Sequence, residues 1–258
     1  CIEGLNIKPT GIYVDVTFGG GGHSKEIMKH LVGGKLFAFD QDSDAHKNNL
    51  KQDGFKLIDA NFCYLRNFLR MEGVRKVDGI LADLGVSSHQ FDVAERGFST
   101  RFEGDLDMRM NTKSVLTAKE IVNDYSEENL ANVLYKYGEL KNSRRIAKEI
   151  VSARQVKMIN TTTELIGVVA KIVTEKYRNQ FLARIFQAIR IEVNDEIVAL
   201  EEMLLSAVDI LKPGGRLVVI SYHSLEDRLV KNLMKKGNLE GNAKKDFFGN
   251  MIKDLKEI

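Results

Sequence analysis

The sequence of 258 residues has 38 basic and 36 acidic side chains, which gives a formal net charge of +2. Hydrophobic residues make up 43% of it and charged residues 29%, a balance that excludes an intrinsically disordered chain and predicts a globular fold with a sizeable core. The charge is too small to indicate a nucleic-acid binder by itself, because local basic patches matter more than the total.

Neither a membrane protein nor a disulfide-rich secreted protein fits the sequence. No apolar run reaches the roughly 18–20 residues of a membrane-spanning helix, and the first residues lack the basic and apolar segments of a signal peptide. Cys1 and Cys63 have neither the spacing of a metal site nor that of a disulfide framework. We therefore expect a cytoplasmic protein without a membrane partner.

Strands and helices alternate in the first third of the chain. The apolar segments that we predict to be strands are residues 11–17, 35–40, 55–59 and 77–83. The segments predicted to be helical start near His23 or cover residues 43–51 and 62–72. Because strands that alternate with helices pair in parallel through right-handed crossovers, this pattern predicts an open α/β sheet covered on both faces.

The alternation stops after the fourth strand. Residues 84–109 have the composition of a loop, and residues 117–177 have helical patterns with three predicted N-caps, Ser126, Asn142 and Thr161. We interpret this stretch as a helical insertion in the sheet domain. The predicted domains are residues 1–110 with 180–258 for the sheet and 111–179 for the insertion.

The sheet domain resumes with a long helix. Apolar residues recur at steps of three and four from Leu182 to Leu211, which predicts one continuous helix. Pro213 and the two glycines after it end that helix, and residues 216–221 form the predicted fifth strand.

A last helix and a candidate strand follow. Ser224 with Asp227 predicts a capped helix that runs through Lys235. Phe247 and Phe248 begin a candidate final strand.

The most informative string is DVTFGGGGHS, residues 15–24, between the first strand and its helix. Glycines there let the backbone approach a ligand closely, and the helix N-terminus offers free N–H groups. The string is not a phosphate-binding P-loop, because Gly-His-Ser stands where such a loop needs Gly-Lys-Ser/Thr. It satisfies a dinucleotide fingerprint only loosely.

Asp15 ends the first strand beside these glycines. A carboxylate at this position would repel a pyrophosphate but attract the ammonium group of an amino-acid ligand. Methionine joined to adenosine through a sulfonium has that ammonium and carries no phosphate, which points to S-adenosyl-L-methionine as the cofactor. The alternative is that Asp15 only accepts hydrogen bonds from N–H groups of the loop.

Two further carboxylates end predicted strands. Asp40 closes the second strand about 20 residues after the glycines, where an acidic side chain can accept both hydroxyls of a ribose; a helix cap is the alternative. Asp83 closes the fourth strand. Because ligands of open parallel sheets bind at the carboxyl ends of the strands, these two residues and Asp15 are predicted to surround one crevice.

At these residues the sequence resembles the bacterial 16S rRNA cytosine-N4 methyltransferases, the H-type small-subunit family also called MraW. The matching strings are GIYVDVTFGGGGHS, DGILADLGVSSHQFDVAERGFS, GDLDMRM, IFQAIRIEVNDE and RLVVISYHSLEDRLVK, and they span nearly the whole chain. The resemblance implies a Rossmann-like S-adenosyl-L-methionine-dependent methyltransferase core with an all-helical insertion domain. It also implies a cytidine in the decoding region of 16S rRNA as the target, with the assembled small ribosomal subunit as the partner.

The resemblance further implies a set of cofactor contacts, with Asp40 on the ribose, Phe62 beside the adenine, and Asp83 and Gln90 at the methyl-donor end. The residues that it assigns to the cofactor are Gly21, Gly22, His23, Asp40, Phe62, Asp83 and Gln90. Without the resemblance, Phe62 reads as an ordinary core aromatic.

Methyl transfer to cytosine N4 needs an acceptor for the amine hydrogens, because the lone pair of this nitrogen is delocalised into the ring. Many amino-methyltransferases carry an Asp/Asn/Ser-Pro-Pro-aromatic string after the fourth strand, and here only its first position, Asp83, is retained. We assign Asp83 as the acceptor. The missing aromatic leaves base stacking to another residue, for which Tyr222 is the candidate; an ordinary strand-end tyrosine is the alternative.

Three arginines in the loop after Asp83 are candidate contacts to RNA phosphates, namely Arg96, Arg101 and Arg109. Salt bridges within the loop are the alternative. No metal is expected, because no spacing typical of a metal site is present. The insertion is compatible with RNA contact and with a homodimer. A NAD-type oxidoreductase and a non-catalytic RNA-binding or assembly factor stay open as other functions.

Overall fold

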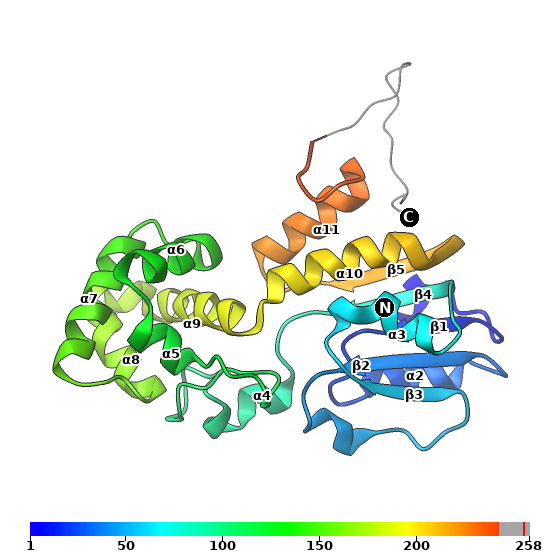
Figure 1. Ribbon diagram of the computed structural model, residues 1–258, viewed down its shortest axis with the longest axis horizontal. Coiled ribbons are helices and arrows are strands. Elements are labelled where there is room, and N and C mark those ends of the chain that lie inside the picture. Colours follow the sequence, from blue (N-terminus) through cyan, green and yellow to red (C-terminus); the bar gives the residue numbers. More distant parts are fainter. Residues whose placement is uncertain (243–254, 256–258) are drawn as a thin grey trace. The chain divides into compact units, whose positions relative to one another are not determined.

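The computed structural model describes residues 1–242 and 255 of the chain (Figure 1). These residues form two compact units. One contains residues 1–85 and the described residues from 197 onward, and the other contains residues 86–196. The first unit carries a five-stranded sheet, and the second is built of helices and loops. The α/β fold predicted from the sequence is confirmed.

The sheet is parallel throughout, with the strand order β3-β2-β1-β4-β5. Its strands are β1 (Ile12–Asp15), β2 (Lys35–Asp40), β3 (Phe55–Asp59), β4 (Val77–Asp83) and β5 (Leu211–Ile220). The chain runs outward from β1 to β3 and then returns past β1 to β4. The switch point between β1 and β4 is where open sheets of this kind bind their ligands.

Helices cover both faces of the sheet. Because successive side chains of a strand point to opposite faces, the sheet separates the core into two layers. Val14 and Ile80 belong to a large core with side chains of α3 and α10. Their neighbours Tyr13 and Leu81 belong to a second core with side chains of α1 and α2. The helices of this unit are α1 (Ile2–Leu5), α2 (Gly22–Lys29), α3 (Leu65–Met71), α10 (Glu196–Ile210) and α11 (Ser224–Lys236), with short 3₁₀ turns η1 (Ala45–Asn48) and η2 (Phe62–Tyr64).

Three helices of the second unit, the helical unit, begin directly after the N-caps that the sequence predicts. Ser126 accepts a hydrogen bond from the Asn129 N–H, and Thr161 forms the predicted capping box with Glu164. Asn142 stands at the N-cap position but makes no capping hydrogen bond with its side chain. The helices are α4 (Ser88–Asp92), α5 (Ala118–Asp124), α6 (Glu127–Gly138), α7 (Ser143–Val156), α8 (Thr162–Val169) and α9 (Arg178–Asn194), with 3₁₀ turns η3 (Ala94–Arg96), η4 (Ala170–Ile172) and η5 (Glu175–Tyr177).

The prediction of one continuous helix from Leu182 to Leu211 is wrong, because the helix is interrupted at Asp195. This residue is left-handed, with φ 49° and ψ 36°, and it separates α9 from α10. Apolar residues keep their spacing across the break, so the sequence pattern hides it. Because α9 packs against α5 and α6, it belongs to the helical unit, which covers residues 86–196 instead of the expected 111–179.

Four smaller expectations differ from the structure. Residues 43–51 hold only a short 3₁₀ turn, and the expected loop after Asp83 contains α4. β5 starts at Leu211, which pairs with Val77, and the Pro-Gly-Gly segment shifts the register before Arg216 pairs with Gly79.

The fourth difference concerns the last helix. His223 caps α11 in place of Ser224, because its ring accepts from the Glu226 N–H. Phe247 and Phe248 lie outside the described residues.

Substitutions at Asp195 test the break between α9 and α10. Because the residue is exposed and left-handed, we expect Asp195→Gly to leave the free energy of unfolding unchanged or slightly raised. A β-branched residue is strained in this conformation, so Asp195→Val should destabilise the protein by roughly 1–2 kcal/mol. Urea unfolding measures both. A continuous helix would give the opposite order, with glycine the more harmful substitution.

Candidate active site

The carboxylates that end β1, β2 and β4 lie at the same edge of the sheet. These strands are neighbours, and Asp15 pairs in register with Ala38 on one side and Leu81 on the other. Asp40 and Asp83 each follow these partners by two residues on their strands. The predicted convergence of three acidic residues is therefore present in the fold. We call this end of the sheet, marked by Asp15, Asp40 and Asp83, the ligand edge.

Asp15 is fully buried and serves the loop that follows it. Its Oδ2 accepts a 2.7 Å hydrogen bond from Ser24 Oγ, and its Oδ1 accepts from the Thr17 N–H at 3.1 Å. Burial raises the pKa of this carboxyl above its ordinary value. Because the side chain has no exposed surface, the structure favours the second interpretation of Asp15, that of an acceptor for the loop.

The glycine loop leaves room for a ligand above the strand ends. Gly21 has φ +75° and is the N-cap of α2, and a Cβ there would lie 2.9 Å from the ring of Phe18. By contrast, a Cβ on Gly20 or Gly22 would meet nothing within 4 Å. The loop thus presents open backbone and the free N–H groups of a helix N-terminus.

Asp40 is hydrogen-bonded to backbone on both sides of its carboxylate. Its Oδ2 accepts from the Gly19 N–H and its Oδ1 from the Asp42 N–H, each at 2.8 Å. Burial raises the pKa of Asp40. Each carboxylate oxygen has a second lone pair, so the fixed group retains capacity to accept from ribose hydroxyls.

Phe62 is joined to this edge by the residue before it. Asn61 Nδ2 donates to Gln41 Oε1 at 3.0 Å, which ties the end of β3 to the residue after Asp40. Phe62 itself is half-buried and packs against the large core. It therefore behaves as the core aromatic that the residues alone indicate, with part of its ring still exposed.

Asp83 is the centre of a polar cluster at the end of β4. Tyr222 donates its hydroxyl hydrogen to Asp83 Oδ1 at 3.0 Å, and His23 Nε2 lies 3.4 Å from Oδ2. The hydrogen bond to Asp83 raises the pKa of the Tyr222 phenol above its ordinary value. The structure thus brings together three predicted residues from β4, α2 and the end of β5.

Tyr222 is held from behind by Glu226, a residue that the sequence interpretation missed. Glu226 is only 4% exposed, and its Oε2 accepts from the Tyr222 N–H at 2.9 Å. Its Oε1 lies 3.2 Å from His223 Nε2. The spacing of His223 and Glu226 at the start of a helix could have signalled this capping arrangement.

The remaining predicted site residues lie in the helical unit. Gln90 is buried and forms a capping box with Ser87 at the start of α4. Arg96 is buried and donates to the carbonyl of Arg109 at 2.8 Å, and Arg109 in turn forms a two-point ion pair with Asp107.

The geometry thus favours the alternative of interactions within the loop for Arg96 and Arg109. Arg101 differs from them, because it is exposed and its guanidinium carbon lies 5.9 Å from the centre of the Phe91 ring.

In residues 1–242 and 255, no group of three or more His, Cys, Asp or Glu side chains could hold a metal ion. None of the helices in the described part of the chain is both long and apolar enough to span a membrane.

Known proteins resemble this chain over nearly its full length. The model of the MraW methylase family matches residues 1–247. The "Ribosomal RNA small subunit methyltransferase H" of Phocaeicola vulgatus is 59% identical over 258 residues, which are 100% of this chain and 85% of that protein. Proteins of the same name from Flavobacterium johnsoniae (58% identity, 100% and 85% coverage) and Bacteroides thetaiotaomicron (57%, 97% and 83%) are similarly close. The chain therefore belongs to the MraW methylase family.

Proposed function

We propose that this protein transfers the methyl group of S-adenosyl-L-methionine to N4 of a cytidine in the decoding region of 16S rRNA. The family match and the names of the relatives support an rRNA methyltransferase. The observation that carries the chemical assignment is the cluster of Asp83, Tyr222 and His23 beside an open glycine loop.

The ligand edge fits a cationic nucleoside without phosphates. Asp40 is fixed by two backbone N–H groups and would accept from the ribose hydroxyls. The open backbone at Gly20 and Gly22 would lie against the cofactor, and the half-exposed ring of Phe62 would lie near its adenine. When bound, the cofactor supplies an electrophilic methyl group on a sulfonium. Gln90 stays a proposed cofactor contact, on the ground of the family resemblance alone.

Asp83 would accept a hydrogen from the cytidine amine. Transfer of the methyl group to N4 would leave the sulfur as a neutral thioether and the amine positively charged. Asp83 would stabilise this charge and accept the proton that the amine then loses. Tyr222 donates to Oδ1 and would orient the carboxylate so that Oδ2 faces the base. In this role Tyr222 is a positioning residue, which differs from the stacking role that the sequence suggested.

The substrate that we propose is the assembled small subunit, which would place the protein in the cytoplasm. Among the three loop arginines, Arg101 is the proposed phosphate contact, because Arg96 and Arg109 are engaged within their loop. A homodimer stays a proposal that sedimentation of the full chain would test. A NAD-type oxidoreductase is disfavoured by the family match and by the names of the relatives, which support an rRNA methyltransferase.

The reaction itself is tested on small subunits from cells that lack this enzyme. Incubation with the protein and cofactor should produce N4-methylcytidine at one position, detected by mass spectrometry of rRNA nucleosides. Methylation at another base or atom would contradict the proposed target. Naked 16S rRNA as the second substrate measures whether assembly is required.

Cofactor binding is tested by thermal shift. S-adenosylhomocysteine should stabilise the protein, whereas NADH should not. Asp40→Asn should weaken this binding by roughly tenfold to a hundredfold, because hydrogen bonds to a charged group contribute about 1.5–3 kcal/mol. Asp53→Ala, at an exposed acid outside the ligand edge, is the control. Stabilisation by NADH alone would reverse the assignment.

Substitutions at Tyr222 separate positioning from stacking. If the hydroxyl orients Asp83, Tyr222→Phe should lower kcat by about tenfold, and Tyr222→Ala should be little worse. If the ring stacks on the base, Phe should retain the rate and only Ala should lose it.

Asp83→Ala should lower kcat by at least about a hundredfold while binding of S-adenosylhomocysteine persists. Full methylation by this variant would remove Asp83 from the mechanism. A wild-type protein that binds rRNA without methylating it would support the assembly-factor alternative.

A further inference from the structure

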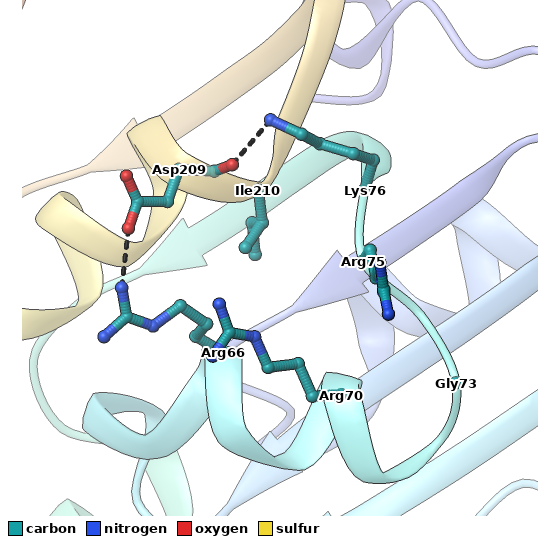
Figure 2. Close-up of a pocket in the computed structure, with 7 residues that line it drawn as sticks. All are labelled: Arg66, Arg70, Gly73, Arg75, Lys76, Asp209 and Ile210. Atoms are coloured by element: carbon teal, nitrogen blue, oxygen red, sulfur yellow. Dashed lines mark hydrogen bonds and ion pairs between the residues drawn. The ribbon is translucent and has the colours of Figure 1, made fainter.

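A basic hollow lies at the edge of the sheet opposite to the three carboxylates. It has a volume of about 760 Å³, and its polar lining comes from α3, the segment that leads into β4, and the end of α10 (Figure 2). The charged residues that line it are Arg66, Arg70, Arg75, Lys76 and Asp209. Because Lys76 directly precedes β4 and Asp83 ends it, the strand separates the hollow from the ligand edge by about 20 Å.

The hollow has a higher net charge than the whole sequence. Four cations and one carboxylate give it a local charge of +3, whereas all 258 residues together have +2. Arg66 and Arg70 are four residues apart on α3, a spacing at which like charges repel. The repulsion between these two arginines is a cost to folding that an anionic ligand would offset.

Two of the cations have partners within the protein. Arg66 Nη1 donates to Asp209 Oδ2 at 2.6 Å, and Lys76 Nζ donates to the carbonyl of Asp209 at 2.7 Å, at the C-terminal end of α10 (Figure 2). These bonds fix the hollow between α3 and α10. The bond to Asp209 uses only one nitrogen of the Arg66 guanidinium, so its other N–H groups are still able to donate to a ligand.

Arg70 and Arg75 are different, because both are exposed and form no ion pair with the described part of the chain. A cation in the last turn of α3 interacts favourably with the helix dipole, which accounts for Arg70 but not for Arg75, beyond the helix end. Guanidinium groups bind phosphate oxygens through two parallel N–H bonds. Cations spread around a wide hollow suit successive phosphates of one strand better than a single phosphate.

We infer that this hollow binds backbone phosphates of the substrate RNA, at a segment away from the methylated base. The inference rests on the proposed rRNA substrate and adds a second contact region to it. Phosphate contacts of this kind fix the position of an RNA without reading its sequence. The hollow would therefore contribute affinity and orientation, while the ligand edge selects the base.

The double variant Arg70→Ala/Arg75→Ala tests this in the full-length chain, with Arg66 and Lys76 kept to preserve the hollow. Binding to 16S rRNA and to small subunits is measured over a series of salt concentrations. We expect the affinity to fall by roughly tenfold at physiological salt. The negative slope of log K against log salt should become shallower by about 1.4–1.8, because each of the two lost phosphate contacts contributes about 0.7–0.9 to its magnitude. Stabilisation by S-adenosylhomocysteine should be unchanged, and the melting temperature should fall by no more than about 2–4 °C, because an exposed cation at a helix C-terminus contributes about 0.3–1 kcal/mol.

The matched control is Lys35→Ala/Lys51→Ala, which removes the same charge from exposed lysines of the same unit and should leave the salt slope near that of the wild type. Arg70→Lys/Arg75→Lys should keep most of the slope, because the charges remain. An unchanged slope for the alanine variant at Arg70 and Arg75 would overturn the inference.

Two other results would also overturn it. Weaker binding to assembled subunits with naked rRNA unaffected would identify an acidic ribosomal protein as the partner. Binding of pyrophosphate in the hollow, with RNA binding unaffected by the double variant, would identify a small phosphate ligand. Failure of the proposed function looks different, since the wild type would then neither bind S-adenosylhomocysteine nor methylate rRNA.

Discussion

The loop between β1 and α2 is hydrogen-bonded to the ends of three strands, and the ligand edge depends on these bonds. The Thr17 hydroxyl accepts the Asp83 N–H at 2.7 Å, although 66 residues separate the two in the chain. The Thr17 N–H donates to buried Asp15, and the Gly19 N–H donates to Asp40. A shift of the loop would leave a buried carboxylate without partners, which costs several kcal/mol. The bonds therefore hold the edge in one geometry before any ligand binds.

The sheet unit separates its charges along the strands. Carboxylates stand at the carboxyl ends of β1, β2 and β4, whereas the basic hollow precedes the start of β4. Such a division suits the two proposed ligands, a phosphate-free cationic nucleoside at the first edge and a polyanion at the second. The net charge of +2 conceals this division, because the opposing charges cancel in the sum.

The polar network at Asp83 extends through Tyr222 to buried Glu226 at the start of α11. Each member has a different task, since Glu226 fixes the backbone of Tyr222 and the phenol then orients the carboxylate. If Asp83 is the acceptor that we propose, it would benefit from such support, because small displacements of a reacting group are costly in rate. Tyr222 is 68% exposed, so its position is set by these hydrogen bonds and not by burial.

The sequence by itself determined the parallel sheet, its first four strands, the acidic strand ends and the family. These features follow from local apolar runs, from the positions of glycines and from motif strings, all of which are present in the sequence itself. Only the tertiary structure decided the break at Asp195, the burial of Asp15, the bond from Tyr222 to Asp83, and the gathering of cations around Asp209. Each of these depends on which distant segments meet, and a periodic pattern carries no information about such contacts.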